Sequence, residues 1–296
     1  MKKENLIGNL LAGFTIFIWG ITFITTKVLL KVLTPEEILV FRFVIAYLIL
    51  MIFCPQRIKL GNFKEEIIFA SLGLTGITLY FWIENLALKY TYASNVGLIS
   101  SAIPIFTAIF AHYITKEEKF TMRFVIGFLF SMVGIFMIIY NGQVLKLSPL
   151  GDLLAVLTAV LFSIYSIILR FLKSNHSQIY ITKKIFFYGV LFILPIAFLK
   201  NISVPNIANL SLYTIGNLLF LSIFASVLCF IMWNKAVVLI GSVKATNYIY
   251  FVPVITMITS ALFLKEKITI VMIIGGILIF IGVYLNGKKS NENPIT

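Results

Sequence analysis

The chain consists of long apolar runs separated by short polar segments. A helix that crosses the hydrocarbon core of a bilayer needs about 20 mostly apolar residues. Ten runs approach this length, and their connections are too short to hold a soluble domain. The pattern predicts an all-α polytopic membrane protein. We predict spans at residues 6–30, 38–53, 67–88, 93–115, 124–140, 150–169, 179–199, 210–233, 243–264 and 268–285.

The second half of the chain repeats the first. Pro104 and Pro253 are 149 residues apart, whereas near the start of each half the offset is 143, as between Trp19 and Phe162. Each half holds five spans, an odd number, so the second half enters the membrane from the opposite side. Further pairs are Asn85 with Asn234, Asn95 with Lys244, Glu117 with Glu266 and Gly127 with Gly276 at 149, and Gly8 with Gly151 and Lys27 with Arg170 at 143.

This repeat predicts the domain organisation. We expect ten transmembrane helices in two inverted five-helix repeats, at residues 1–142 and 149–288, followed by a cytoplasmic tail at 289–296. Inverted repeats are typical of secondary transporters, in which one half rocks against the other around a central site.

The basic residues predict the orientation. With the N-terminus in the cytoplasm, 16 of the 24 Lys and Arg residues fall in cytoplasmic segments and 8 fall on the other side. Cytoplasmic segments carry the excess of positive charge, so we expect both termini in the cytoplasm and the protein in the cytoplasmic (inner) membrane. The apolar run at 6–30 is too long for a cleavable signal, whose apolar region covers about 7–15 residues.

Composition excludes several classes of function. Hydrophobic residues make up 60% of the chain and charged residues only 12%, against about 25% charged residues in soluble domains. The net charge of +13 is spread over short clusters between apolar runs, which indicates a lipid bilayer rather than nucleic acid as the partner. We expect no cofactor, metal or enzyme activity, because neither the cysteines nor the histidines have metal-ligand spacing and no phosphate-loop motif is present.

Several short motifs are similar to those of one transporter family. They are Phe-Ile-Trp-Gly at 17–20, Phe-Arg-Phe at 41–43, the turn at 87–94, Pro104 with the acidic pair at 117–118, and Gly-Asp-Leu-Leu-Ala at 151–155. In this order they resemble the drug/metabolite transporter superfamily, in its ten-helix EamA-like branch, over nearly the whole chain. The resemblance implies export of amino acids or related small metabolites through a central cavity. The turn at 240–243 and Lys244 depart from the family pattern.

A polar and aromatic stripe marks the expected cavity. Thr15, Trp19 and Thr22 share one face of the first span, and in lipid such a stripe must face protein or water. The repeat places Phe162 and Tyr165 on the corresponding face of the sixth span. The alternative is that the threonines bond within their own helix and help helices to pack. The other candidate cavity residues are Tyr80, Glu84, Asn95, Asn247 and Tyr248.

Three charges are candidates for a gate. Glu84 is the one acidic residue well inside a span, and Lys27 and Arg42 lie at a similar outer depth. We expect Glu84 to pair with one of these cations when the outer gate is closed, and to serve proton coupling or to bind a substrate amine. The alternative is a structural ion pair, or a carboxylate that reaches the lipid headgroups.

Prolines and small residues suggest where helices break and pack. Pro104 and Pro253 each free the carbonyl four residues earlier, at Ser100 and Ile249. Paired interrupted helices point to a binding site; the alternative is a kink that improves packing. Glycine and serine at 127, 131, 134 and 275–276 are expected to form close helix contacts, within the chain or at a homodimer face.

The combined prediction is a secondary active transporter that takes a small-molecule substrate and works by alternating access. A flippase for a lipid-linked precursor is an alternative in the same fold, and it would need a cavity open sideways to lipid. An intramembrane enzyme is a further alternative, which would need convergent catalytic groups at one depth, whereas Glu84 stands alone.

Overall fold

The fold is described from a computed structural model that gives residues 2–91, 93–115, 122–140, 148–172, 176–202, 210–255, 258–259 and 269–287. All regular structure in these ranges is helical, which confirms the all-α prediction. The end of the ninth predicted span, the acidic pair at 117–118 and the tail at 289–296 lie outside the described residues.

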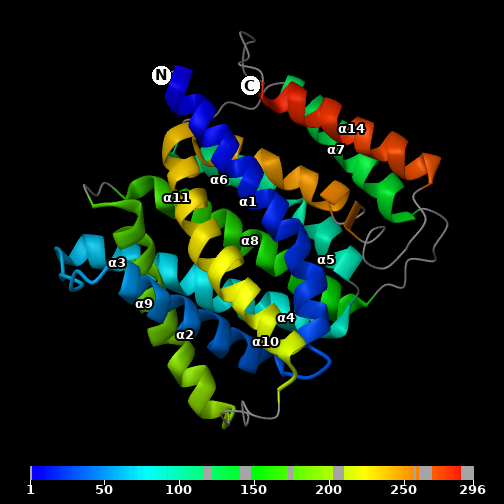
Figure 1. The fold of residues 1–296 in the computed structure, drawn as a ribbon. Helices are drawn as coiled ribbons and strands as arrows, with labels where there is room; N and C mark the ends of the chain where they lie inside the picture. The colour runs from blue at the N-terminus through cyan, green and yellow to red at the C-terminus, as the bar shows by residue number, and fades with distance from the viewer. Residues whose placement is uncertain are drawn as a thin grey trace.

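The first half forms five helical runs (Figure 1). The second run begins at a capping box, in which the Thr34 hydroxyl accepts from the Glu37 amide and the Glu37 carboxylate accepts from the Thr34 amide. The runs are α1 (Lys2–Leu29); α2 (Pro35–Phe53); α3 (Phe63–Gly73) continued by η1 (Leu74–Leu79) and α4 (Tyr80–Tyr90); α5 (Ala93–Ser100) followed by α6 (Ile103–Phe110) and η2 (Ala111–Thr115); and α7 (Met122–Tyr140).

The second half forms five corresponding runs. Gly241, with a φ of 87°, allows the tight turn between the third and fourth of them, a conformation that glycine adopts without strain. The runs are α8 (Pro149–Phe171); α9 (Gln178–Leu199); α10 (Leu212–Leu219) continued by η4 (Phe220–Leu228) and α11 (Cys229–Ile240); α12 (Ser242–Asn247) followed by η5 (Tyr248–Phe251) and a helical turn at 252–255; and α14 (Ile270–Gly287).

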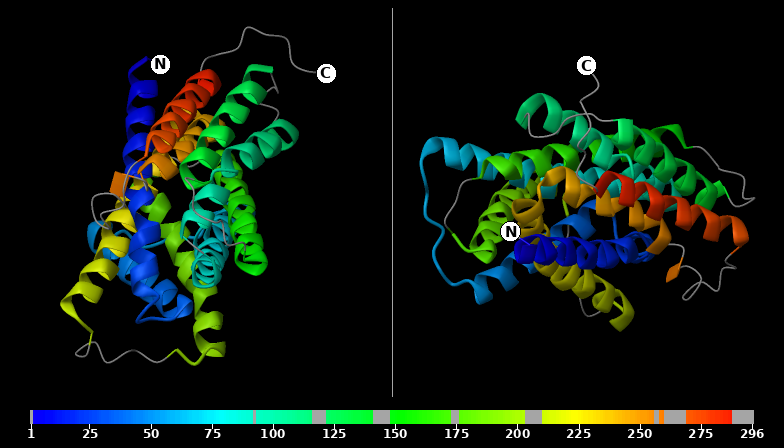
Figure 2. Two further views of the ribbon diagram at one scale, coloured as in Figure 1. Left: turned by 90° about the vertical axis from the view of Figure 1, so that its right-hand side faces the viewer. Right: turned by 90° about the horizontal axis from the view of Figure 1, so that it is seen from above.

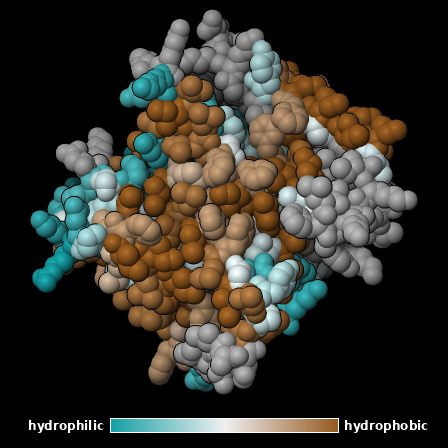
Figure 3. Space-filling view, viewed as in Figure 1, coloured by the Kyte–Doolittle hydropathy of each residue, from teal (hydrophilic) through white to brown (hydrophobic). Residues whose placement is uncertain are grey.

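The surface and the helix lengths are those of a membrane protein. Five described helical runs are long and apolar enough to cross a bilayer: Lys3–Leu29, Phe63–Tyr90, Pro149–Phe171, Gln178–Leu199 and Leu212–Ile240. Shorter apolar helices add Ile103–Thr115, Val125–Gly134 and Ile273–Gly282. Apolar side chains cover most of the face in Figure 3, with hydrophilic ones near its edges. The start of α1 and the end of α14 lie on the same side of the molecule (Figures 1 and 2).

Irregular segments recur at equivalent positions of the two halves. Segment η1 is π-helical, and its residues 74–79 shifted by 149 become 223–228, the second part of the π-helical η4. The fourth run of each half is interrupted just before its proline, by a turn at 101–102 ahead of Pro104 and by the 3₁₀ helix η5 ahead of Pro253. The apolar pattern of the sequence contains no sign of the π-helical segments.

Contacts between the halves obey the same two offsets. A Cβ atom on Gly8 would lie 2.5 Å from the Ile240 side chain, and one on Gly151 would lie 2.7 Å from Thr91. Residues 8 and 151 differ by 143, and residues 91 and 240 differ by 149. The start of each half's first helix therefore packs closely against the end of the other half's third run, and the glycine permits that approach.

Cations at the ends of α1 and α8 cap the third run of their own half. Lys27 Nζ donates to the carbonyls of Leu88 and Thr91, the latter at 2.9 Å. Arg170 Nη1 donates to the Val237 carbonyl at 3.4 Å. Residues 27 and 170 differ by 143, and residues 88 and 237 differ by 149. The two halves therefore make equivalent contacts between a cation and a helix end. A cation at a helix C-terminus satisfies its last carbonyls and the negative end of its dipole.

The connection between α2 and α3 covers two lysines of α9. Lys183 Nζ donates to the carbonyls of Cys54 and Gln56, and Lys184 Nζ forms an ion pair with Glu66. Both lysine side chains are buried. An apolar helix can carry these two cations because this loop and the first turn of α3, both in the other half, supply their acceptors.

Helices α7 and α14 pack against each other along their length (Figures 1 and 2). A Cβ on Gly134 would overlap the Gly275 carbonyl, and one on Gly282 would overlap Ser131 and the Gly127 carbonyl. These small residues let the two backbones approach closely. They serve contacts within the chain, so they give no support to the homodimer face that was the alternative.

The close contact between α7 and α14 predicts a position-specific effect of an added methyl group. Gly282→Ala should destabilise the protein by about 1–3 kcal/mol, because the methyl overpacks a backbone contact. Thermal unfolding in detergent micelles measures this. Gly276→Ala, in the same helix, is the control, because a Cβ there meets nothing within 4 Å. Equal melting temperatures for the two variants would contradict the described packing.

The lysine cap on α4 predicts a second difference in stability. Lys27→Met keeps most of the side-chain length and removes two charged hydrogen bonds, each worth about 1.5–3 kcal/mol. We expect a clearly lower melting temperature. Lys31→Met, at an exposed position just beyond α1, should leave it unchanged. A Lys27→Met variant as stable as the Lys31→Met variant would show that the cap contributes nothing.

Candidate functional site

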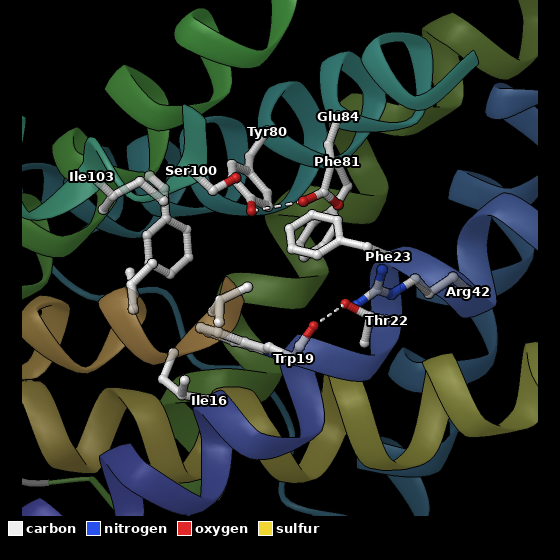
Figure 4. A pocket seen from close by; sticks show the side chains of 13 residues that line it. Ile16, Trp19, Thr22, Phe23, Arg42, Tyr80, Phe81, Glu84, Ser100 and Ile103 are labelled. Atoms are coloured by element: carbon white, nitrogen blue, oxygen red, sulfur yellow. Dashed lines mark hydrogen bonds between the residues drawn. The ribbon is translucent and has the colours of Figure 1, made fainter. Parts of the chain in front are cut away.

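A pocket lies where the two halves meet at their interrupted helices (Figure 4). Its empty volume, including the part open to solvent, is about 440 Å³. The lining residues are Ile16, Trp19, Thr22, Phe23, Arg42, Tyr80, Phe81, Glu84, Ser100, Ile103, Phe162, Ile249 and Val252.

The lining reflects the internal repeat. Trp19 and Phe162 are equivalent at the offset of 143. Ser100 with Ile249, and Ile103 with Val252, are equivalent at the offset of 149. Ser100 and Ile249 lie four positions before the prolines of their halves, Pro104 and Pro253. Ile103 and Val252 lie one position before them, where the fourth run of each half is interrupted. The pocket is therefore built from corresponding elements of both repeats.

Trp19 is fixed by the irregular backbone of the other half. Its ring contacts those of Phe162 and Trp233 at centroid distances of 5.5 and 5.1 Å. Its indole N–H donates to the Ala225 carbonyl, in η4, at 2.9 Å. In an α-helix that carbonyl would accept from the Cys229 amide, which here donates to the carbonyls of Phe224 and Ser226 instead. The π-helical segment thus leaves an acceptor that the indole of the other half uses.

Two opposite charges face the pocket from the first half. The Glu84 carboxylate accepts a hydrogen bond from the Tyr80 hydroxyl at 2.8 Å. Arg42 Nε donates to the Ser226 hydroxyl at 2.7 Å, and its guanidinium lies 4.2 Å from the centre of the Phe81 ring. Figure 4 shows both side chains reaching the pocket from different elements. Their side chains are almost fully buried, with Glu84 5% and Arg42 2% exposed.

Glu84 makes no direct ion-pair contact with a described residue in this conformation, although its carboxylate and the Arg42 guanidinium attract each other across the pocket. Across the part of the chain that the structure describes, neither Lys27 nor Arg42 lies within 4.0 Å of its carboxylate. Lys27 instead caps α4 and does not line the pocket. The reason is local, because Lys27 Nζ reaches the carbonyls at the C-terminal end of α4, where a helix leaves its last carbonyls without an intrahelical donor. Of the three candidate gate charges, the pocket brings together Arg42 and Glu84.

The structure divides the candidate cavity residues into two groups. Trp19, Thr22, Tyr80, Glu84 and Phe162 line the pocket. Thr22 donates to the Trp19 carbonyl in its own helix at 2.7 Å, as the packing alternative supposed.

The second group lies away from the pocket. Thr15 is fully buried, and Tyr165 donates to the Asn234 side chain within the second half. Asn247 and Tyr248 lie in the fourth run of the second half but outside the lining, and the Asn95 side chain is outside the described residues. Thr15 and Tyr165 share the expected faces, yet neighbouring helices pack over them.

Sequence reasoning missed most apolar lining residues. Phe23, Ile103 and Val252 are lining residues of this kind, and nothing in their type separates them from other apolar residues of the spans. A usable signal existed for some of them: the positions one and four residues before each proline, where the helix is interrupted, line the pocket in both halves.

Comparison with known proteins gives the family. The sequence model of the EamA-like transporter family matches residues 6–140 and again residues 149–287. A protein of Archaeoglobus fulgidus named "Uncharacterized transporter" is 30% identical over 291 residues, covering 96% of this chain and 98% of that protein. "Uncharacterized transporter YyaM" of Bacillus subtilis is 29% identical over 290 residues, covering 96% and 93%.

A solved crystal structure shares the fold. It has a TM-score of 0.72 at 18% sequence identity and covers 96% of both chains. The two matches of one family model agree with the repeat that the offsets of 143 and 149 predict. The chain belongs to the EamA-like transporter family, in the drug/metabolite transporter superfamily, and is a multi-pass membrane transporter.

Proposed function

We propose that the protein is a secondary active transporter that exports amino acids or related small metabolites across the cytoplasmic membrane by alternating access. The observation that carries this proposal is the pocket between the two halves, which combines an aromatic wall with one buried cation and one buried anion. Small-molecule sites are mostly apolar with a few well-placed polar groups, and transporter sites lie at the repeat interface beside interrupted helices.

The lining favours a substrate that is partly polar and electrically neutral overall. Arg42 and Glu84 contribute opposite charges and are both buried, so a ligand with a net charge would leave one of them uncompensated. Trp19, Phe81 and Phe162 offer apolar contact to the rest of the ligand. An amino acid meets both requirements.

Contacts across the pocket support a conformational cycle. The contacts of Trp19 with Ala225 and of Arg42 with Ser226 join the first half to the second. In our proposal, rocking of the halves opens the pocket to each side in turn.

Orientation follows from the charge distribution. We place both termini in the cytoplasm, because 16 of the 24 basic residues then lie in cytoplasmic segments. The common side of the start of α1 and the end of α14 is consistent with this arrangement (Figure 1).

Glu84 is the proposed site for the substrate amine, with a proton as its competitor. The carboxylate has a single hydroxyl partner, Tyr80, in the described part of the chain. When substrate leaves on the outer side, a proton can take its place on the carboxylate and return inward with the empty carrier. Proton influx would then drive export, as in any exchange in which two ligands compete for one group.

Efflux from proteoliposomes loaded with a panel of amino acids tests this function. Wild-type efflux should accelerate under a proton gradient directed against the substrate flow. Glu84→Gln should fold but lose that acceleration and about tenfold or more of apparent affinity, the equivalent of about 1.4 kcal/mol or more from one charged contact.

The matched control is Glu65→Gln, at the start of α3 and outside the pocket, which should behave as wild type. A Glu84→Gln variant whose efflux follows the gradient as wild type does would remove Glu84 from the mechanism. A wild-type protein that exports no member of the panel would overturn the proposed substrate class.

A further inference from the structure

Arg42 is a buried cation with part of its hydrogen-bonding capacity unused. The side chain is 2% exposed, and its guanidinium lies near the rings of Phe81 and Phe43, at 4.2 and 5.3 Å from their centres. Nε donates to the Ser226 hydroxyl. Among the described residues, neither Nη1 nor Nη2 makes a hydrogen bond to a protein acceptor. Figure 4 shows the guanidinium directed into the pocket.

A buried guanidinium whose terminal donors have no protein acceptor is costly. Aromatic faces compensate part of the charge and the Glu84 charge attracts it across the pocket, but at 2% exposure the terminal N–H groups have lost most of their water without gaining a protein acceptor. Glu84 lines the same pocket, yet its carboxylate is bonded to Tyr80 and lies more than 4.0 Å from Arg42. The unused donors therefore offer a site for a group that enters the pocket from outside the chain.

The shape and charge of the site select the kind of anion. The two terminal nitrogens of a guanidinium form a planar fork that matches a carboxylate. A phosphate dianion also offers oxygens to this fork, but its second negative charge would need a second cation. Arg42 is the one cation among the lining residues that the structure describes, and Glu84 would repel the extra negative charge. A singly charged, planar carboxylate fits this environment best.

Ser226 holds the fork in position. It lies in η4, directly after Ala225, whose carbonyl binds Trp19. Two consecutive residues of the second half's π-helical segment therefore fix two lining residues of the first half, one aromatic and one charged. With Nε bound to the hydroxyl at 2.7 Å, the other edge of the guanidinium is left for the pocket.

We propose that Arg42, positioned by Ser226 of the π-helical segment η4, forms the subsite for the carboxylate of the substrate. The inference rests on the proposed function and deepens it. Arg42 touches the carboxylate, Glu84 takes the amine, and Ser226 is a positioning residue that acts through Arg42. Compounds that keep the amine and lack the carboxylate are then poor ligands.

The test compares matched compounds in proteoliposome exchange. Leucine and phenylalanine are each competed by the same amino acid, by its carboxamide and by its deaminated acid. In wild type the carboxamide should compete at least tenfold more weakly than the amino acid. Arg42→Gln should bind the amino acid and its carboxamide equally. The preference of Arg42→Lys for the amino acid should fall between those of wild type and Arg42→Gln, because an ammonium is a point charge without the fork.

The role of Ser226 is tested by how much more strongly the amino acid competes for exchange than its carboxamide, expressed as a ratio. Ser226→Ala should raise the apparent KM for the amino acid about 3–10-fold and lower that ratio, with little change in maximal rate. Ser226→Thr keeps the hydroxyl and should restore both. The control is Ser222→Ala, in the same segment, whose hydroxyl donates to the Leu218 carbonyl and does not touch Arg42. It should leave the ratio unchanged.

The outcomes separate the two proposals. Wild-type exchange of leucine or phenylalanine with equal competition by acid and carboxamide would overturn the carboxylate subsite and leave amino-acid export standing. A Ser226→Ala variant that loses rate or melting temperature with the wild-type ratio would reduce Ser226 to a structural residue. A wild type that exchanges neither these two nor any other amino acid of the panel would overturn both proposals.

Discussion

A backbone carbonyl inside a bilayer has no water to bond, so every irregular turn of a transmembrane helix must find a partner in the protein. The structure meets this constraint with side chains from elsewhere in the fold. The Trp19 indole donates to the Ala225 carbonyl, which the π-helical turn leaves without its α-helical donor, and Lys27 Nζ donates to the carbonyls at the end of α4. Ser163 donates to the Ile103 carbonyl, beside the interrupted fourth run, at 3.0 Å. These contacts let the chain break its helices where a pocket is needed.

The helical scaffold follows the internal repeat, whereas the charged residues among the described lining of the pocket, Arg42 and Glu84, both come from the first half. At the offset of 149, Glu84 corresponds to Trp233 and Tyr80 corresponds to Cys229. The second half therefore has no counterpart of the carboxylate or its hydroxyl partner. It contributes the acceptors of η4, on which Trp19 and Arg42 are held. The first half supplies the charged groups of the pocket, and the second half supplies the acceptors that hold Trp19 and Arg42 in place. A relative movement of the halves would therefore change the pocket.

Much of this architecture could be predicted from the sequence. Apolar run lengths predict the helical runs, and the matched prolines and charges predict the repeat, because these features depend on residue type at a fixed spacing. The π-helical segments could not be predicted, since a run that is apolar on all sides has no period that separates a π-turn from an α-turn. The same limit explains Tyr165: its helix face was expected correctly, but which neighbour covers that face depends on tertiary packing. Glu84 was expected to pair with Lys27 or Arg42 because the three charges lie at one depth. The backbone carbonyls at the end of α4 bind Lys27, and Arg42 lines the pocket with Glu84.

The central claim is that substrate crosses the membrane through the pocket between the two halves. Ser100 and Ile249 are equivalent lining residues, one from each half, so a single cysteine at either position, with Cys54 and Cys229 replaced, reports on access to the pocket. The account predicts that Ser100→Cys and Ile249→Cys react with a membrane-impermeant maleimide added from either side during turnover. It also predicts that a saturating concentration of the exported amino acid protects both positions. Labelling from only one side under every substrate gradient, or labelling that substrate does not slow, would contradict it.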